Sequence, residues 1–234
     1  MRVLWRKLRQ VENRLFVSVS MIAALLLAFG LLATEATGSE ALGLDRELML
    51  ALRVHGNPGV PVGPPWMQEA ARDVTALGSM IVLAIILFSV AGYLFLSGRR
   101  ATAWLMLGAV LGGAALNYLL KFSFARPRPD FVAPAVRVFT ASFPSGHATL
   151  SAITYLTIGA LLARAHSESS ARIYVMALAA MLTILAGLSR IYLGAHYPTD
   201  VLAGWCLGTA WAMGCWVLMT WLQRRGQVEP PERS

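Results

Sequence analysis

The sequence predicts an all-α membrane protein in which six transmembrane helices form one bundle. Of the 234 residues, 57% are hydrophobic and only 14% are charged, and the mean hydropathy is +0.60. Soluble domains carry roughly 25% charged residues, so this composition indicates an integral membrane protein. Six apolar segments each approach the ~20 residues that a helix needs to cross a bilayer. In lipid such segments must be helical, because their backbone groups have to bond internally.

The expected spans are residues 15–34, 77–97, 101–120, 148–163, 173–193 and 201–222. The fourth is the shortest and crosses fully only if its polar beginning is counted. The first could instead be a cleaved signal peptide, but its apolar core exceeds the usual ~7–15 residues. We expect it to be retained in a single membrane domain, 1–234, with a basic arm at 1–14, an external loop at 35–76 and a tail at 223–234.

The positions of the basic residues predict the orientation of the bundle. Twelve of them flank the spans on one side, which the positive-inside rule makes cytoplasmic, and both termini are then cytoplasmic. The same placement accounts for much of the net charge of +8 without a nucleic-acid partner. These twelve residues are Arg2, Arg6, Lys7, Arg9, Arg14, Arg99, Arg100, Arg164, Arg172, Arg224, Arg225 and Arg233.

Two features of the connections and helices concern packing rather than chemistry. In the loop 35–76, "DRELMLALRV" could form an amphipathic helix on the membrane surface, and "GNPGVPVGPPW" is expected to break regular structure. This loop is either a plain connector or a lid over the substrate, and both readings stay open. Gly108 and Gly112, and likewise Gly204 and Gly208, are four residues apart, a spacing that lets helices pack closely.

Ionisable residues gather at the external ends of the last four spans. "KFSFARPRPDF" follows the third span, "PSGH" opens the fourth, and "SRIYLGAHYPTD" joins the fifth to the sixth. Ionisable groups at membrane depth are costly, and a functional role is their default interpretation. Taken alone, Lys121, Arg126 and Arg128 could be interfacial side chains that snorkel, and His147 could be a polar helix cap.

Taken together, these residues predict an anion site. Lys121, Arg128 and Arg190 provide positive charge, and the two arginines can each present paired donors to an oxyanion. Ser145 and Gly146 open a helix whose free N–H groups and dipole attract anions. Gly146 also lets an anion approach the backbone closely.

His196 and Asp200 predict a nucleophile beside the anion site. Pro198 suits the first turn of a helix, which places Asp200 near a helix N-terminus, where the dipole keeps its carboxylate ionised. The carboxylate can accept the proton of one imidazole nitrogen and leave the other as a directed lone pair. A zinc site formed with His147 is the alternative, but the nearby cations would repel a divalent metal. We therefore expect neither a metal nor a cofactor.

The three segments resemble the signature of the type 2 phosphatidic acid phosphatase superfamily of membrane lipid phosphatases. Lys, six residues and Arg-Pro come first, then Pro-Ser-Gly-His, then Ser-Arg, five residues, His, three residues and Asp, over roughly residues 70–222. The resemblance implies metal-independent hydrolysis of a phosphomonoester or diphosphate. It implies that His196 attacks phosphorus, Asp200 orients it and His147 protonates the leaving oxygen. It also assigns the phosphate oxygens to Lys121, Arg128, Ser145, Gly146 and Arg190.

The resemblance further implies a lipid phosphate substrate, held at the external face of a bacterial inner membrane. Among the family's substrates we favour undecaprenyl diphosphate, with phosphatidylglycerophosphate, phosphatidate and lipid A as alternatives. Vanadium haloperoxidases use a similar motif set but are soluble, which six spans argue against. A lipid or anion transporter would need its charges near the bilayer midplane and would not need the His–Asp pair. The sequence makes no prediction of the oligomeric state.

Overall fold

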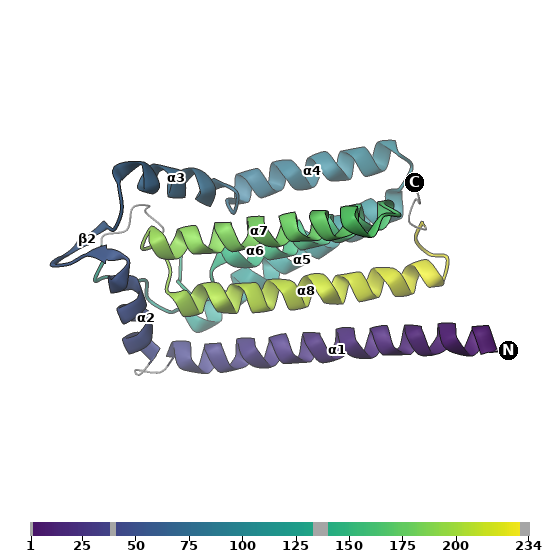
Figure 1. Cartoon of the computed structure of the whole chain (residues 1–234), viewed down its shortest axis with the longest axis horizontal. Coiled ribbons are helices and arrows are strands. Elements are labelled where there is room, and N and C mark those ends of the chain that lie inside the picture. The colour runs from purple at the N-terminus through teal and green to yellow at the C-terminus, as the bar shows by residue number, and fades with distance from the viewer. Residues whose placement is uncertain (1, 38–40, 133–139, 230–234) are drawn as a thin grey trace.

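The computed structural model describes residues 2–37, 41–132 and 140–229, and these residues are mostly helical. The long helices lie side by side in one bundle, with the start of α1 and the end of α8 at the same end (Figure 1). The side chains of the arm 1–14 and the last part of the tail, 230–234, lie outside the described residues. The long helices are α1 (Arg2–Thr37), α4 (Met80–Leu96), α5 (Arg100–Phe124), α6 (Gly146–Ala165), α7 (Ser169–Tyr192) and α8 (Pro198–Arg224).

The described helices agree with a bundle of six spans, although the second span differs from the expectation. Five helices are long and apolar enough to cross a membrane by themselves: α1, α5, α6, α7 and α8. A sixth span results only if α4 is joined to α3 (Pro65–Ala76), and the two helices are bent by 43° at their junction. The helix α4 lies within three residues of the expected span at 77–97, but the expectation did not include the bend or the contribution of α3. Ser79 breaks the helix there, because its side chain accepts a hydrogen bond from the Val82 N–H as an N-cap.

The loop expected at 35–76 is mostly ordered secondary structure. It contains α2 (Ala41–Ala51), a two-stranded antiparallel sheet of β1 (Arg53–Val54) and β2 (Asn57–Pro61), and then α3. The proline- and glycine-rich stretch thus forms a strand and the start of a helix, contrary to the expectation. The helix expected in "DRELMLALRV" is present as α2, which lies across the end of the bundle (Figure 1).

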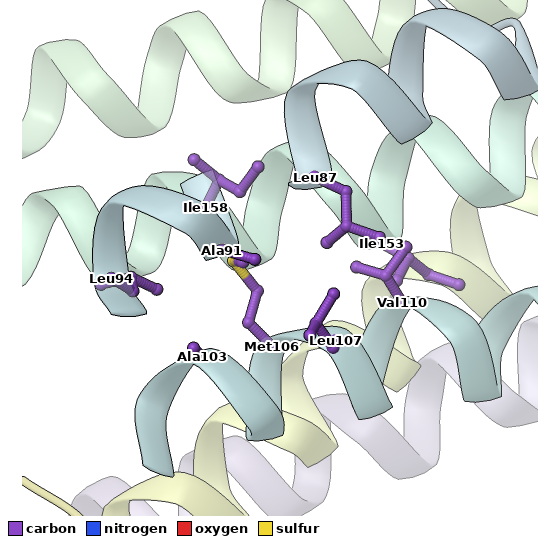
Figure 2. Close-up of a cluster of buried hydrophobic side chains, with 9 residues drawn as sticks. All are labelled: Leu87, Ala91, Leu94, Ala103, Met106, Leu107, Val110, Ile153 and Ile158. Carbon is purple, nitrogen blue, oxygen red and sulfur yellow. The ribbon is translucent and has the colours of Figure 1, made fainter. Parts of the chain in front are cut away.

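One apolar cluster packs α4 against its neighbours (Figure 2). Its buried side chains come from α4, α5 and α6, and the branched chains interdigitate in the space between these helices. Association between helices in lipid depends on such packing, because lipid tails are as apolar as the side chains. The cluster consists of Leu87, Ala91, Leu94, Ala103, Met106, Leu107, Val110, Ile153 and Ile158.

Small residues bring α8 very close to α6. A Cβ atom at Gly204 would lie 2.9 Å from the Ser145 carbonyl oxygen, and one at Gly208 would lie 2.6 Å from the Thr149 carbonyl oxygen. Close packing at this pair is confirmed, and it holds the beginnings of α6 and α8 together. The expectation for Gly108 is wrong, since no atom of the described part of the chain lies within 4 Å of a Cβ placed there.

Candidate active site

The beginning of α8 holds the His–Asp pair. Pro198 is the first helical residue, and Asp200 turns back to accept a hydrogen bond from the Tyr197 N–H at 3.0 Å. The same carboxylate oxygen lies 3.3 Å from His196 Nδ1 and accepts a hydrogen bond from the Ser142 hydroxyl. Both members of the pair are buried. The positive end of the helix dipole and these donors keep the carboxylate ionised.

The contacts of His196 define its tautomer. Arg128 Nη1 lies 3.2 Å from His196 Nε2. A guanidinium has no lone pair, so Nε2 is the acceptor and the ring proton is on Nδ1, facing Asp200. Burial lowers the pKa of His196, and the hydrogen bond and charge of Asp200 only partly oppose this shift. The ring is therefore neutral at pH 7 and carries its lone pair on Nε2, toward Arg128.

Arg128 is held mainly by neutral oxygen atoms. Its guanidinium donates to the Ala195 carbonyl at 2.5 Å and to the Thr140 carbonyl at 2.8 Å. Burial lowers the pKa of Arg128, opposed by the charge of Asp200, but an arginine remains positive at neutral pH. Arg128 makes no salt bridge within the described residues, so its charge is free to bind an anion.

The beginning of α6 lies against this pair. Ser145 is the N-cap: its side chain accepts a 3.5 Å bond from the Ala148 N–H, and its own N–H donates to the Asp200 carbonyl at 3.0 Å. Gly146 is the first helical residue, and a Cβ atom there would lie 3.6 Å from Lys121 Cε. Lys121, in the last turn of α5, donates to the Ala141 carbonyl at 2.6 Å. The helix N-terminus and the ammonium group thus face the same small volume.

His147 and Arg190 complete the set. Arg190 is buried in α7, its Nη1 donates to the Thr75 hydroxyl at 3.2 Å, and its Nε has no hydrogen-bond partner among the described residues. His147 packs where α3 bends into α4: a Cβ atom at Gly78 would lie 3.0 Å from His147 Cβ. His147 is within electrostatic reach of Arg190 and His196. The structure thus brings together all eight candidate residues, which come from three separate stretches of the chain.

Four residues of this site were missed as site residues by the sequence analysis. Arg126, considered only as a snorkelling side chain, is instead buried and donates to Asp200 Oδ1 at 2.6 Å. The Nη2 atom of Arg126 donates to the carboxylate of Asp45 in α2 at 2.9 Å. Thr199 and Ser142 contact the same carboxylates. The repeated Arg-Pro of "RPRP" was a signal for Arg126, whereas nothing distinguished Asp45 from the other acidic residues of its loop.

Comparison with known proteins places the chain in a family. The model of the PAP2 superfamily matches residues 102–224, more than half of the chain, which belongs to this superfamily. Phosphatidylglycerophosphatase B of Bacillus subtilis is 35% identical over 178 residues, an alignment that covers 69% of this chain and 85% of the relative. An undecaprenyl-diphosphatase of Sulfolobus acidocaldarius is 32% identical over 99 residues, covering 40% of this chain and 44% of the relative.

A solved structure supports the same assignment. The crystal structure of a transmembrane PAP2-type phosphatidylglycerolphosphate phosphatase from Bacillus subtilis superposes with a TM-score of 0.78 at 29% sequence identity. The superposition covers 87% of this chain and 98% of that one. This chain is therefore a multi-pass membrane protein of a lipid phosphatase family, and the expected family and all-α membrane fold are confirmed. The roles of the eight residues and the orientation in the membrane remain predictions.

Proposed function

We propose that this protein removes a phosphate from a lipid phosphate through a phosphohistidine formed on His196. The arrangement around His196 carries this proposal. Nδ1 faces the Asp200 carboxylate, while Nε2 faces the Arg128 guanidinium. A lone pair in contact with a cation marks a place that an anionic electrophile, such as a phosphoryl group, would enter by displacing the guanidinium from Nε2 and binding to both groups.

The proposed reaction has two displacements at phosphorus. In the first, His196 Nε2 forms a bond to phosphorus as the bond from phosphorus to the lipid oxygen breaks, and His147 protonates that oxygen. In the second, His147 takes a proton from a water molecule whose oxygen attacks phosphorus. The phosphorus–nitrogen bond then breaks, and inorganic phosphate leaves. Asp200 stabilises the imidazolium that exists between the two steps.

The phosphate oxygens are assigned to the groups around this position. Lys121, Arg128 and Arg190 supply positive charge, and the three side chains lie near enough for their like charges to repel one another until an anion binds. The Ser145 hydroxyl and the Gly146 N–H, at the beginning of α6, supply neutral donors, whereas the Ser145 N–H is already bound to the Asp200 carbonyl. Together they would stabilise the charge that builds on the equatorial oxygens in the transition state. We propose on this basis that the reaction needs no metal.

Two lipid substrates are favoured by different observations. Phosphatidylglycerophosphate is our first candidate, because the relative and the solved structure that cover most of this chain are named for it. Undecaprenyl diphosphate, which the sequence analysis favoured, is the second candidate, supported by a relative that matches a shorter part of the chain. Lipid A and phosphatidate remain the further members of a test panel.

The decisive assay is phosphate release by the purified protein from these four lipids in detergent, with EDTA present. We expect full activity in EDTA, competitive inhibition by vanadate, and the highest kcat/KM with phosphatidylglycerophosphate. Loss of activity in EDTA that zinc or magnesium restores would refute the metal-free mechanism. A higher kcat/KM with undecaprenyl diphosphate would make that lipid, rather than phosphatidylglycerophosphate, the preferred substrate.

The proposed orientation places the site at the periplasmic or external face of a bacterial cell membrane. A reporter fused after Arg225 should be cytoplasmic, and one inserted next to Gly59 in β2 should be external. If both reporters lie on the same side of the membrane, the six-span topology and the outward-facing site are both wrong.

A further inference from the structure

A chain of buried charges leads from His196 to α2. His196 faces Asp200, Asp200 Oδ1 accepts from Arg126 Nη1 at 2.6 Å, and Arg126 Nη2 donates to Asp45 Oδ2 at 2.9 Å. The exposed fractions of these four residues are 2%, 0%, 5% and 1% in the same order. Screening by solvent is weak at such burial, so each charge acts strongly on its neighbour.

Asp45 is bound at the beginning of α8 as well as to Arg126. Its Oδ1 accepts from the Thr199 N–H at 3.0 Å, and its Oδ2 accepts from the Thr199 hydroxyl at 2.6 Å. Arg126 also donates to that hydroxyl at 2.8 Å and lies over the Tyr197 ring. Thr199 precedes Asp200 in the sequence, and the Tyr197 N–H donates to the Asp200 carboxylate. The carboxylate of α2 is thereby part of the support of the His–Asp pair.

The charges of this chain do not cancel while His196 is neutral. Asp45 and Asp200 carry two negative charges, and Arg126 between them carries one positive charge. The remaining negative charge is balanced when His196 becomes an imidazolium. Without Asp45, the pair Arg126 and Asp200 would already be neutral, and the guanidinium would compete with His196 for the Asp200 carboxylate.

We propose that Asp45 is a positioning residue for the phosphatase reaction: it holds Arg126 and offsets its charge, so that Asp200 can orient His196 and stabilise it when positive. This rests on the proposed role of His196 as the nucleophile. Met49, one turn further along α2, is fully buried against Val132 and Tyr197 and fixes the helix in this place. The helix α2 is then a component of the active site rather than a connector.

Rapid-quench measurement of acid-labile phosphate on the full-length protein in detergent tests this proposal, with an aryl phosphate and with phosphatidylglycerophosphate. Asp45→Asn should slow phosphoenzyme formation by about tenfold or more, as is usual for groups that orient reactive ones. Its KM should stay close to that of the wild type. Glu47→Gln is the matched control, because it removes an exposed carboxylate from the same helix and should keep the wild-type rate.

The pH profile separates an electrostatic role from a merely structural one. His196 is faced by Asp200 of α8, Lys121 and Arg128 from α5 and its following loop, and His147 of α6. Asp45→Asn removes a negative charge and should move the acidic limb of kcat/KM to lower pH. Arg126→Gln removes a positive charge from the same chain and should move that limb to higher pH. The proposal would be overturned if the acidic limb moved in the same direction in both variants, or if it moved in neither.

The outcomes also separate this inference from the proposed function. Trapped phosphate in His196→Ala would refute the nucleophile, whatever Asp45 does. Wild-type phosphorylation by Asp45→Asn, with no trapped phosphate in His196→Ala, would refute only the role of Asp45. If Asp45→Asn does not fold in detergent, Asp45→Glu decides, since it keeps the charge but displaces the guanidinium. Wild-type kinetics in Asp45→Glu would then overturn the proposal.

Discussion

The two sides of the His196 ring differ in how their charges are compensated. On the Nδ1 side, Arg126 is enclosed between the carboxylates of Asp45 and Asp200, and each of its charged contacts is short. On the Nε2 side, Arg128 contacts carbonyl and hydroxyl oxygens and the imidazole itself. The two arginines are two residues apart in the sequence, yet one stabilises the fold and the other has positive charge left for a ligand.

This difference explains how one buried histidine can be both oriented and reactive. A side chain between two fixed carboxylates cannot turn toward a phosphate without leaving a buried charge unpaired, which is very costly. A side chain held by neutral oxygens loses much less when an anion replaces them. The asymmetry therefore assigns support to the Nδ1 side and substrate binding to the Nε2 side, and the following variants test that assignment.

The largest loss of activity is expected when the imidazole of His196 is removed. His196→Ala removes the nucleophile, so kcat should fall by about 10⁴-fold or more with every substrate, and no acid-labile phosphate should form. The measurement is rapid quench with an aryl phosphate. The variant Tyr192→Phe, which removes a hydroxyl that donates to the Val62 carbonyl, is a control and should form the phosphoenzyme normally.

The next largest effect separates His147 from the pair. His147→Ala should lower kcat with a lipid phosphate by about 10²–10⁴-fold, because the leaving oxygen then departs without a proton. Much of this loss should disappear with an activated aryl phosphate, which needs little protonation. Asp200→Asn should not recover in this way, since it weakens the orientation of His196. Equal recovery of both variants would show that the acid and the orienting group have been wrongly assigned.

The two arginines should respond differently to the same substitution. Arg126→Lys leaves one of two buried carboxylates without its partner and should lower the free energy of unfolding by about 3–5 kcal/mol. Arg128→Lys should leave unfolding nearly unchanged but raise KM and lower kcat by about tenfold, because a lysine cannot offer paired donors. Thermal unfolding and kinetics of both variants make the comparison. A stability loss confined to Arg128→Lys would reverse our assignment of the two sides.

The smallest effect concerns pH. Burial lowers the pKa of His196 in the folded protein. Just below the ordinary pKa of histidine, the side chain is therefore protonated in the unfolded chain but still neutral in the folded protein. Stability should therefore fall as the pH decreases below about 6.5, by up to about 1.4 kcal/mol per pH unit from this residue. His196→Gln should show a shallower decrease than the wild type in thermal unfolding. Equal slopes would mean that His196 is not held neutral by burial.

The membrane helices and the three polar segments could be predicted because their signals are local. Hydropathy placed five spans within a few residues, and Pro198 marked the first residue of α8. The bend that joins α3 to the second span was not predicted, because it depends on a cap at Ser79 and on contacts of α3 with α7. Gly108 was wrongly assigned to a helix contact, since hydropathy does not tell which side of a helix faces its neighbours.

The sequence by itself determined the chemistry available to this protein, since residue types and their spacing along helix ends specify which groups can reach a phosphate. Only the tertiary structure decided how those groups are compensated. Arg126 and Arg128 have the same side chain in the same motif, and 81 residues separate Arg126 from the Asp45 that distinguishes it. Contacts of that range have no periodic signal in the sequence, because they arise from the path of the chain over the end of the bundle.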